Sequence, residues 1–244
     1  MQGGTIRLFK VSGIQVYLHF TWFIIAAWQF TQRAGVYSSP IWAALEYLAL
    51  FAIVLLHEFG HALACRQTGG RADHIVLWPL GGIAFVDPPR RPGAVLWSIV
   101  AGPLVNVLLF PVLSVLFLIS RARGWDFEAP DLHQFIFIVG FINGWLLLFN
   151  LLPVYPLDGG QILRALLWFP LGEIRSLQIA SVIGLVGSIA LGALFLWLGW
   201  SLFWSALLVF FLLSRGVAGW QYAKAMAAEK EAAAGMPIVP PDLR

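Results

Sequence analysis

Six stretches of the 244-residue chain are apolar for long enough to cross a lipid bilayer. A membrane-spanning helix needs roughly 20 mostly apolar residues. The six stretches are residues 14–32, 41–65, 94–120, 134–152, 176–198 and 201–220. Composition agrees, because 60% of the residues are hydrophobic and only 11% are charged, whereas a soluble domain is about half apolar and a quarter charged. The sequence therefore predicts an all-α polytopic membrane protein with six transmembrane helices.

The distribution of Lys and Arg predicts the orientation of these helices. If both termini lie on one side, the other side carries only Arg33, Arg121 and Arg123. The side with the termini then carries Arg7, Lys10, Arg66, Arg71, Arg90, Arg91, Arg164, Arg175, Arg215, Lys224, Lys230 and Arg244. Because cytoplasmic loops are enriched in Lys and Arg, we expect both termini in the cytoplasm. The basic residues form no single face, so the expected surroundings are the lipid bilayer and not nucleic acid.

The chain shows no sign of a second folded domain. Residues 1–223 are expected to form one membrane core, and residues 224–244 a disordered cytoplasmic tail that is rich in proline near its end. The single cysteine, Cys65, excludes an intrachain disulfide and a cysteine-based metal cluster.

The second apolar stretch ends in HEFGH, residues 57–61, which has the pattern H-E-x-x-H. On a helix, His57 and His61 lie about 40° apart around the axis and can bind one metal ion. Glu58 flanks this face, where a glutamate can polarise a metal-bound water. The alternative is a buried histidine pair with a structural glutamate. We favour the metal site, because polar groups are costly at membrane depth and tend to be functional there.

A catalytic zinc ion usually has three protein ligands, so a third ligand is needed. The acidic residues in or beside the apolar stretches are Glu46, Asp87, Asp158 and Glu173. Asp158 is favoured, because it follows the helix-breaking prolines of NLLPVYPLDGG, residues 150–160. Irregular backbone at membrane depth is tolerated only inside protein or around a cavity. Counting residues along the helices places both motifs in the cytoplasmic half of the bilayer. The alternative role of Asp158 is a helix cap.

Asn150 lies eight residues before Asp158, near the end of the fourth apolar stretch. Its amide could donate a hydrogen bond to the oxyanion that forms when water attacks a peptide carbonyl. It could equally form a hydrogen bond between helices, which is common for Asn in membranes. Asn106 and Asn143 are also polar residues in apolar stretches, and the sequence leaves their surroundings open.

The loop between the second and third stretches contains HIVLWPLGGIAFVD, residues 74–87, which predicts a β-hairpin around Gly81 and Gly82. A peptide bond inside an intact helix is shielded, so a helical segment must become extended before its peptide bonds can be attacked. An exposed strand edge can pair with such a segment, and we expect Gly81, Gly82, Ile83 and Ala84 to contact it. The alternative is a hairpin that only packs against the helices.

Together, HEFGH, NLLPVYPLDGG and AGPLVN at residues 101–106 resemble the site-2 protease family of intramembrane zinc metalloproteases. The resemblance covers roughly residues 5–220. It implies that His57, His61 and Asp158 bind one zinc ion, that Glu58 is the general base and that Asn150 contacts the substrate or transition state. It also implies a re-entrant hairpin and cleavage within the transmembrane segment of another protein. The loops and tail are too short for the PDZ or CBS domains of larger relatives, so a minimal core is expected.

The function expected from these features is a zinc-dependent intramembrane endopeptidase. The alternative is a metal-binding membrane protein without catalytic activity, such as a transporter or a sensor. A transport path would favour several polar stations across the membrane, whereas the motifs form one cluster at one depth. Glu58 is also superfluous for metal binding alone.

Overall fold

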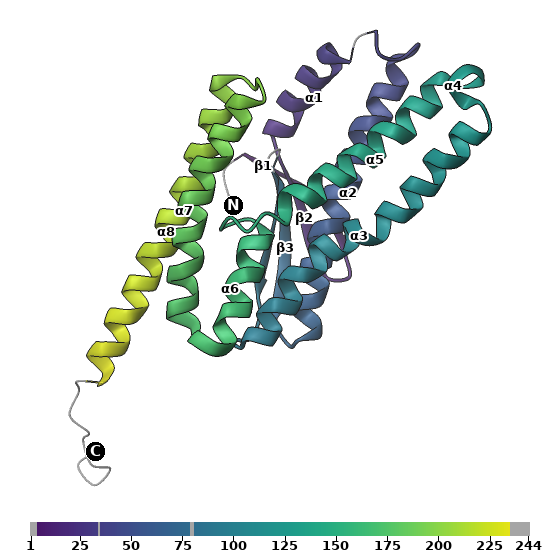
Figure 1. Ribbon diagram of the computed structural model, residues 1–244. Helices are drawn as coiled ribbons and strands as arrows, with labels where there is room; N and C mark the ends of the chain where they lie inside the picture. Colours follow the sequence, from purple (N-terminus) through teal and green to yellow (C-terminus); the bar gives the residue numbers. More distant parts are fainter. Residues whose placement is uncertain (1–3, 34, 79–80, 235–244) are drawn as a thin grey trace. The chain divides into compact units, whose positions relative to one another are not determined.

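A small β-sheet and long helices build the N-terminal part of the chain (Figure 1). The computed structural model describes residues 4–33, 35–78 and 81–234. The chain divides into two units, residues 1–151 and 152–244. The first unit contains β1 Thr5–Val11, β2 Ile14–His19, α1 Thr21–Gln32, α2 Pro40–Gln67, β3 Arg71–Trp78, β4 Gly81–Asp87, α3 Pro92–Ala122, α4 Trp125–Glu128 and α5 Pro130–Asn150. The second unit contains α6 Asp158–Leu171, α7 Glu173–Trp197 and α8 Leu202–Ala234.

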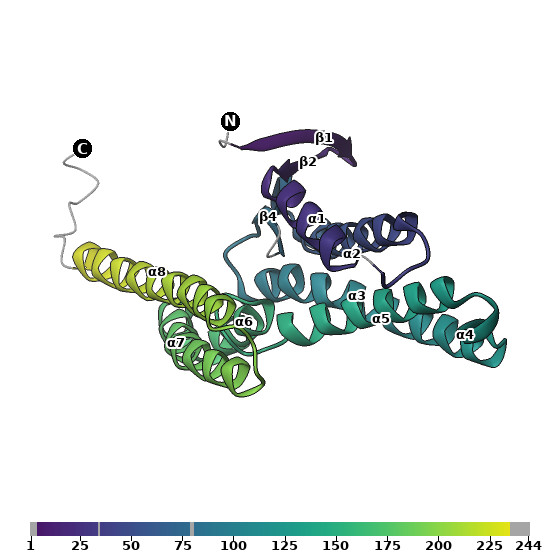
Figure 2. The ribbon, with the colours of Figure 1, turned by 90° about the horizontal axis from the view of Figure 1, so that it is seen from above.

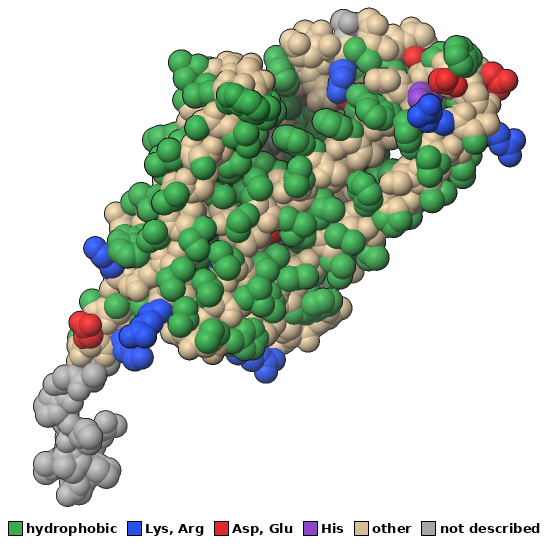
Figure 3. All heavy atoms as spheres, in the orientation of Figure 1, with side chains coloured by type: hydrophobic (Ala, Val, Ile, Leu, Met, Phe, Trp, Pro, Cys, Tyr) green, Lys and Arg blue, Asp and Glu red, His purple; other side chains and the backbone are tan. Residues whose placement is uncertain are grey.

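Five helices within the described residues are long and apolar enough to cross a membrane, namely α2, α3, α5, α7 and α8. They confirm five of the six predicted stretches as helices. Hydrophobic side chains cover most of their visible surface, and charged side chains gather near α4 and near the C-terminal end of α8 (Figure 3). Such large apolar surfaces require a lipid environment. The protein is therefore an integral membrane protein, as predicted.

The first predicted span is not one helix. Residues 14–32 form β2 followed by α1, and a helix of 12 residues is only about 18 Å long, which is too short for a hydrocarbon core of about 30 Å. β2 pairs with β1 through a turn at Ser12 and Gly13, where φ is 49° and 77°. Two residues with positive φ suit a tight hairpin. The prediction of a helix over this stretch is wrong, and six transmembrane helices are not confirmed.

The strands of the described chain form one sheet in the order β1-β2-β3-β4. β2 and β3 are parallel, with Gln15 opposite His74. β3 and β4 form an antiparallel hairpin in which Trp78 lies opposite Gly81. The hairpin predicted over residues 74–87 is confirmed as a hairpin, but Gly81 and Gly82 lie in β4, opposite Trp78 and Leu77, and do not form the turn between the strands as predicted. The re-entrant position of the hairpin in the membrane stays a prediction. The sequence analysis missed the hairpin of β1 and β2 and its parallel pairing with β3.

A hydrophobic core joins the sheet to α1 and α2. Its buried members are Ile14, Val16, Trp22, Val54, Ala62, Ala72, Ile75 and Leu77. β2 packs near the C-terminal half of α2, whereas Gln29, late in α1, reaches Glu46 near the start of α2. The segment made of β2 and α1 therefore runs antiparallel to α2.

The helices α2, α3 and α5 pack against one another, and α3 and α5 lie side by side (Figure 2). α2 begins with Ser39, whose hydroxyl accepts a hydrogen bond from the Ile41 N–H, and with Pro40 in the first turn. Both residues favour a helix start at this point. The packing of α2, α3 and α5 places the polar residues of three separate apolar stretches next to one another.

In the second unit, α7 and α8 form the predicted helical hairpin. Gly199, with φ at 82°, lies in the connection between them. The core of this unit contains Val154, Leu191 and Leu212. α8 continues to Ala234, past the boundary expected at residue 223. The rest of the expected tail, residues 235–244, lies outside the described residues.

Candidate functional site

The histidines and the glutamate of the H-E-x-x-H motif are buried in the C-terminal half of α2. His57, Glu58 and His61 are 4%, 6% and 7% exposed. The Nε2 atoms of the two histidines lie 3.1 Å apart, and their rings are nearly perpendicular. The expected stacking of His57 and His61 on one helix face is therefore present.

Close packing of α3 against α2 holds the motif in place. A Cβ atom added to Gly60 would lie 2.5 Å from the carbonyl oxygen of Ala101 on α3. A Cβ atom added to Gly102 would lie 2.2 Å from Nε2 of His61. The two glycines let a backbone approach closely where any side chain would collide. The Ala-Gly-Pro sequence of α3 thus has a steric role beside the histidines.

Each histidine forms a hydrogen bond from Nδ1 to an oxygen atom of α3. Nδ1 of His61 lies 2.9 Å from the carbonyl oxygen of Ser98, and Nδ1 of His57 lies 2.6 Å from Oδ1 of Asn106. A carbonyl oxygen only accepts hydrogen bonds, so Nδ1 of neutral His61 carries the proton and its Nε2 is an acceptor.

This donor set fits a zinc ion. Two nitrogen ligands of a tetrahedral zinc, each about 2.0–2.1 Å from the metal, lie about 3.3 Å apart. The observed separation of 3.1 Å between the Nε2 atoms of His57 and His61 is close to that value. Metal-bound histidines also commonly donate the other ring N–H to an oxygen atom. Both features agree with the metal role that the sequence predicts for His57 and His61.

Glu58 contacts the strand that was predicted to bind substrate. Its Oε2 atom accepts a hydrogen bond of 2.9 Å from the backbone N–H of Ala84 on β4. The other predicted contacts, Gly81, Gly82 and Ile83, lie in the same strand and pair with Trp78, Leu77 and Val76 of β3. The structure thus brings Ala84 to the motif, a contact that the sequence did not predict.

The remaining predicted site residues lie at helix ends. Asn150 is the last residue of α5 in the first unit, and Asp158 is the first residue of α6 in the second unit. The loop before α6 packs tightly, since a Cβ atom on Gly160 would lie 2.3 Å from the backbone nitrogen of Tyr155. Because Asp158 and the histidines belong to separate units, the three-residue ligand set remains a prediction.

Sequence reasoning left the roles of Asn106 and Asn143 open, and the structure places both at the site. Asn106 lies on α3 and Asn143 on α5, and both side chains are fully buried. Asn106 contacts His57 and Asn143 in turn. The signal in the sequence was an amide within an apolar stretch, which indicates a polar partner without identifying it.

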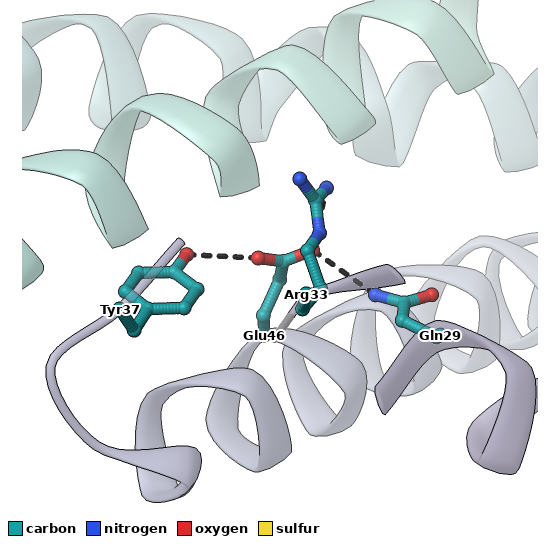
Figure 4. A network of polar contacts seen from close by, with 4 residues as sticks. All are labelled: Gln29, Arg33, Tyr37 and Glu46. Carbon is teal, nitrogen blue, oxygen red and sulfur yellow. Dashed lines mark hydrogen bonds and ion pairs between the residues drawn. The ribbon is translucent and has the colours of Figure 1, made fainter. Parts of the chain in front are cut away.

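A second polar cluster lies near the N-terminal end of α2 (Figure 4). The fully buried carboxylate of Glu46 accepts hydrogen bonds from Tyr37 at 2.8 Å and Gln29 at 3.0 Å, and it pairs with Arg33 at 2.8 Å. Burial and the neighbouring Glu46 raise the pKa of the Tyr37 hydroxyl above its ordinary value. This cluster joins α1 to α2 and gives Glu46 a set of structural partners.

The sequence matches two related families of peptidases. Residues 118–194 match Peptidase family M50, and residues 15–152, more than half of the chain, match the Peptidase M50B-like family. The chain belongs to the Peptidase M50B-like family. The resemblance to site-2 proteases is thereby confirmed, since several similar proteins are named zinc metalloproteases and a similar solved structure is that of a site-2 protease.

Three similar proteins illustrate the relationship of this M50B-like chain to the rest of its family. Zinc metalloprotease MJ0392 of Methanocaldococcus jannaschii is 36% identical over 180 residues, which are 74% of this chain and 50% of the relative. Putative zinc metalloprotease sll0528 of Synechocystis is 31% identical over 263 residues, covering 98% of this chain and 67% of the relative. The solved structure of the site-2 protease from Methanocaldococcus jannaschii is 29% identical, with a TM-score of 0.60 over 88% of this chain and 95% of that chain. The chain thus spans about half the length of the first of these relatives.

Proposed function

We propose that this M50B-like chain is a zinc-dependent intramembrane endopeptidase that hydrolyses peptide bonds within transmembrane segments of other membrane proteins. The observation that carries the proposal is the pair of Nε2 atoms 3.1 Å apart, beside Glu58, on an apolar helix. His57, His61 and Asp158 would hold one zinc ion per chain. The names of the similar proteins support the same activity.

The chemistry divides between the metal and the side chains of the chain. A bound zinc ion would supply a Lewis acid that polarises the attacking water and the scissile carbonyl. Glu58 is the general base, which takes a proton from the water and passes it to the leaving amine. Asn150 donates a hydrogen bond to the carbonyl oxygen as negative charge develops there.

We propose that the substrate segment pairs with β4 over Gly81–Ala84. β4 is an outermost strand among the described strands, so its outer edge can accept an added strand. The N–H of Ala84 points away from β3, because it donates to Glu58. A carbonyl oxygen of the paired substrate would replace Glu58 as the acceptor of this N–H. Substrate pairing would then leave the carboxylate available for the water.

For the orientation, we propose that both termini and the catalytic motif lie on the cytoplasmic side. β2 has 6 residues with a rise of about 3.3 Å each, and α1 has 12 residues with a rise of about 1.5 Å each. Together they extend about 38 Å. They run antiparallel to α2. This length suits a sixth crossing made of a strand and a helix. Arg66, at the end of α2, donates hydrogen bonds to the carbonyl oxygens of Ser12 and Gly13, which supports a cytoplasmic position for this turn.

The orientation can be tested with a single cysteine. In a Cys65→Ala background, Ser12→Cys should react with a membrane-impermeant maleimide in inverted vesicles and not in intact cells. Reaction from the outside of intact cells would contradict the proposed orientation.

Metal content and cleavage test the proposed activity separately. Purified protein should contain about one zinc ion per chain, and His57→Ala and Asp158→Asn should each lose it. Glu58→Gln should keep the zinc ion and lose cleavage of a transmembrane substrate, because the base is removed and the ligands stay. Zinc lost only in His57→Ala would contradict the role of Asp158. Full zinc content with flux of metal across vesicles, and no cleavage, would favour the transporter alternative.

A further inference from the structure

Two fully buried amide side chains connect His57 to the helix α5. Asn106 on α3 and Asn143 on α5 lie among apolar helices, where a polar group is stable only if its hydrogen bonds are satisfied. Asn106 contacts His57 directly, and Asn143 contacts Asn106. In this series of hydrogen bonds across α2, α3 and α5, each bond can have only one donor and one acceptor, so fixing one bond fixes the next.

The contact of Asn143 with the backbone sets the direction of the series. Nδ2 of Asn143 lies 3.0 Å from the backbone carbonyl oxygen of Asn106. Because a backbone carbonyl only accepts hydrogen bonds, the Asn143 atom that faces it must be the amide nitrogen. The side-chain oxygen of Asn143 therefore faces Asn106, and the O and N atoms of this amide cannot be interchanged without losing that bond.

The orientation of Asn143 determines which atom of the Asn106 amide faces His57. Oδ1 of Asn143 lies 2.8 Å from Asn106, so the Asn106 atom that faces it is the donor Nδ2. Oδ1 of Asn106 consequently faces His57, at 2.6 Å from Nδ1. An amide oxygen accepts, so Nδ1 of His57 carries the proton and the lone pair of neutral His57 is on Nε2.

We propose that Asn106 and Asn143 are positioning residues for the metal centre, which hold His57 in the tautomer with the proton on Nδ1. The proposal rests on the proposed role of His57 as a zinc ligand. Asn106 provides the acceptor, and Asn143 acts only through Asn106, whose amide it orients. With the same tautomer at His61, both Nε2 atoms face each other as acceptors at 3.1 Å, an arrangement that a cation between them stabilises.

The two histidines differ in how their orientation can be disturbed. His61 donates to a backbone carbonyl of α3, which a side-chain substitution does not remove. His57 donates to a side chain, which a substitution does remove. Substitution of either asparagine should therefore change the tautomer of His57 and leave that of His61 in place.

The experiment measures the tautomers directly in the metal-free protein. Protein labelled with ¹⁵N-histidine in detergent gives separate NMR signals for protonated and unprotonated ring nitrogens, and His57→Gln identifies the signals of His57. Wild-type His57 should be protonated at Nδ1. Asn106→Leu and Asn143→Leu should shift the proton wholly or partly to Nε2. Asn106→Asp, which keeps an acceptor oxygen at the same place, should retain the wild-type tautomer.

Zinc affinity, measured by competition with a chelating dye, provides the second readout. Loss of a partner behind a ligating histidine typically lowers metal affinity about 10–100-fold, and we expect a loss in this range for Asn106→Leu and Asn143→Leu. Ser120→Ala is the matched control, because Ser120 is also buried on α3 but bonds to Phe117 and His133. It should change neither readout.

The possible failures point to different conclusions. If wild-type His57 is protonated at Nε2 in the metal-free protein, the proposed positioning role of Asn106 and Asn143 is wrong. It is also wrong if a folded Asn106→Leu variant binds zinc as tightly as Ser120→Ala does. A wild-type chain that takes up no zinc would instead refute the proposed metal centre, while the tautomer measurement would still test the direction of the hydrogen bonds.

Discussion

The substitution Gly102→Ala should displace a proposed metal ligand by steric means alone. The added methyl carbon would lie 2.2 Å from Nε2, 2.3 Å from Cε1 and 2.8 Å from Cδ2 of His61. Carbon atoms in van der Waals contact are about 3.5–4.0 Å apart. The His61 ring or the helix must therefore move by roughly the difference between this contact distance and the 2.2 Å separation, which is more than about 1 Å. A metal site tolerates errors of only about 0.2 Å in its ligand distances.

Both zinc binding and stability should respond to Gly102→Ala. Loss of a hydrogen-bond partner of a metal ligand lowers metal affinity by up to about 100-fold. We expect zinc affinity to fall by at least about this factor, because here the ligand itself moves. Overpacking should lower the free energy of unfolding by about 1–3 kcal/mol, although alanine is the better helix former by about 1 kcal/mol. Zinc content after gel filtration and thermal unfolding in detergent measure the two effects.

Gly93→Ala is the control for Gly102→Ala on the same helix. A Cβ atom on Gly93 would meet no atom within 4 Å, so its zinc content and stability should equal or exceed those of the wild type. If Gly102→Ala bound zinc as tightly as Gly93→Ala and unfolded at the same temperature, the close packing of α3 on His61 would not be a constraint on the site.

Three further substitutions test separate contacts. Ala84→Pro removes the N–H that would pair with a substrate carbonyl, and because this N–H points away from β3, the sheet should persist. Cleavage should fall by up to about tenfold, in line with the loss of one neutral hydrogen bond to the substrate, and zinc should be retained. Ala84→Gly keeps the N–H and should remain active. Glu46→Gln removes the charge that pairs with Arg33, so it should lower the unfolding temperature without changing zinc content; an equal loss of zinc would mean that the two clusters are coupled. Tyr37→Phe should reduce the loss of stability at high pH. The pKa of Tyr37 is raised in the folded state, so the folded chain keeps a proton that the unfolded chain loses above about pH 10. The stability of the wild type should therefore fall as pH rises beyond that value. Equal decreases in unfolding temperature between pH 9 and pH 11 in the wild type and in Tyr37→Phe would contradict this role of Tyr37.

The features that depend on local sequence were predictable. Long apolar runs predicted α2, α3, α5, α7 and α8, because a run of that length has few other stable forms in a membrane. The pairing of His57 with His61 followed from helix geometry alone. The hairpin of β3 and β4 followed from runs rich in β-branched residues near a Gly-Gly pair, although this pair lies in β4 and not in the turn.

The features that were missed depend on distant parts of the chain or on competing local signals. Only His19 and Thr21 interrupt the apolar sequence where β2 ends and α1 begins, so hydropathy alone merged them into one span. The Ser12-Gly13 turn was the contrary signal. The partners of Asn106 could not be found from sequence, because they lie on two other helices. The contact between Glu58 and Ala84 depends equally on how the sheet packs against α2.

The parallel pairing of β2 with β3 imposes an order on biosynthesis. Gln15 pairs opposite His74, so one edge of the β1–β2 hairpin has no partner until roughly 60 further residues have been made, which takes about 3–12 s at 5–20 residues per second. During this time α1 and α2 are synthesised, because they lie between the two strands in the sequence. An apolar strand edge in this state can pair with other chains. We therefore expect the edge of β2 to be the part of the nascent sheet most exposed to wrong pairing until β3 emerges.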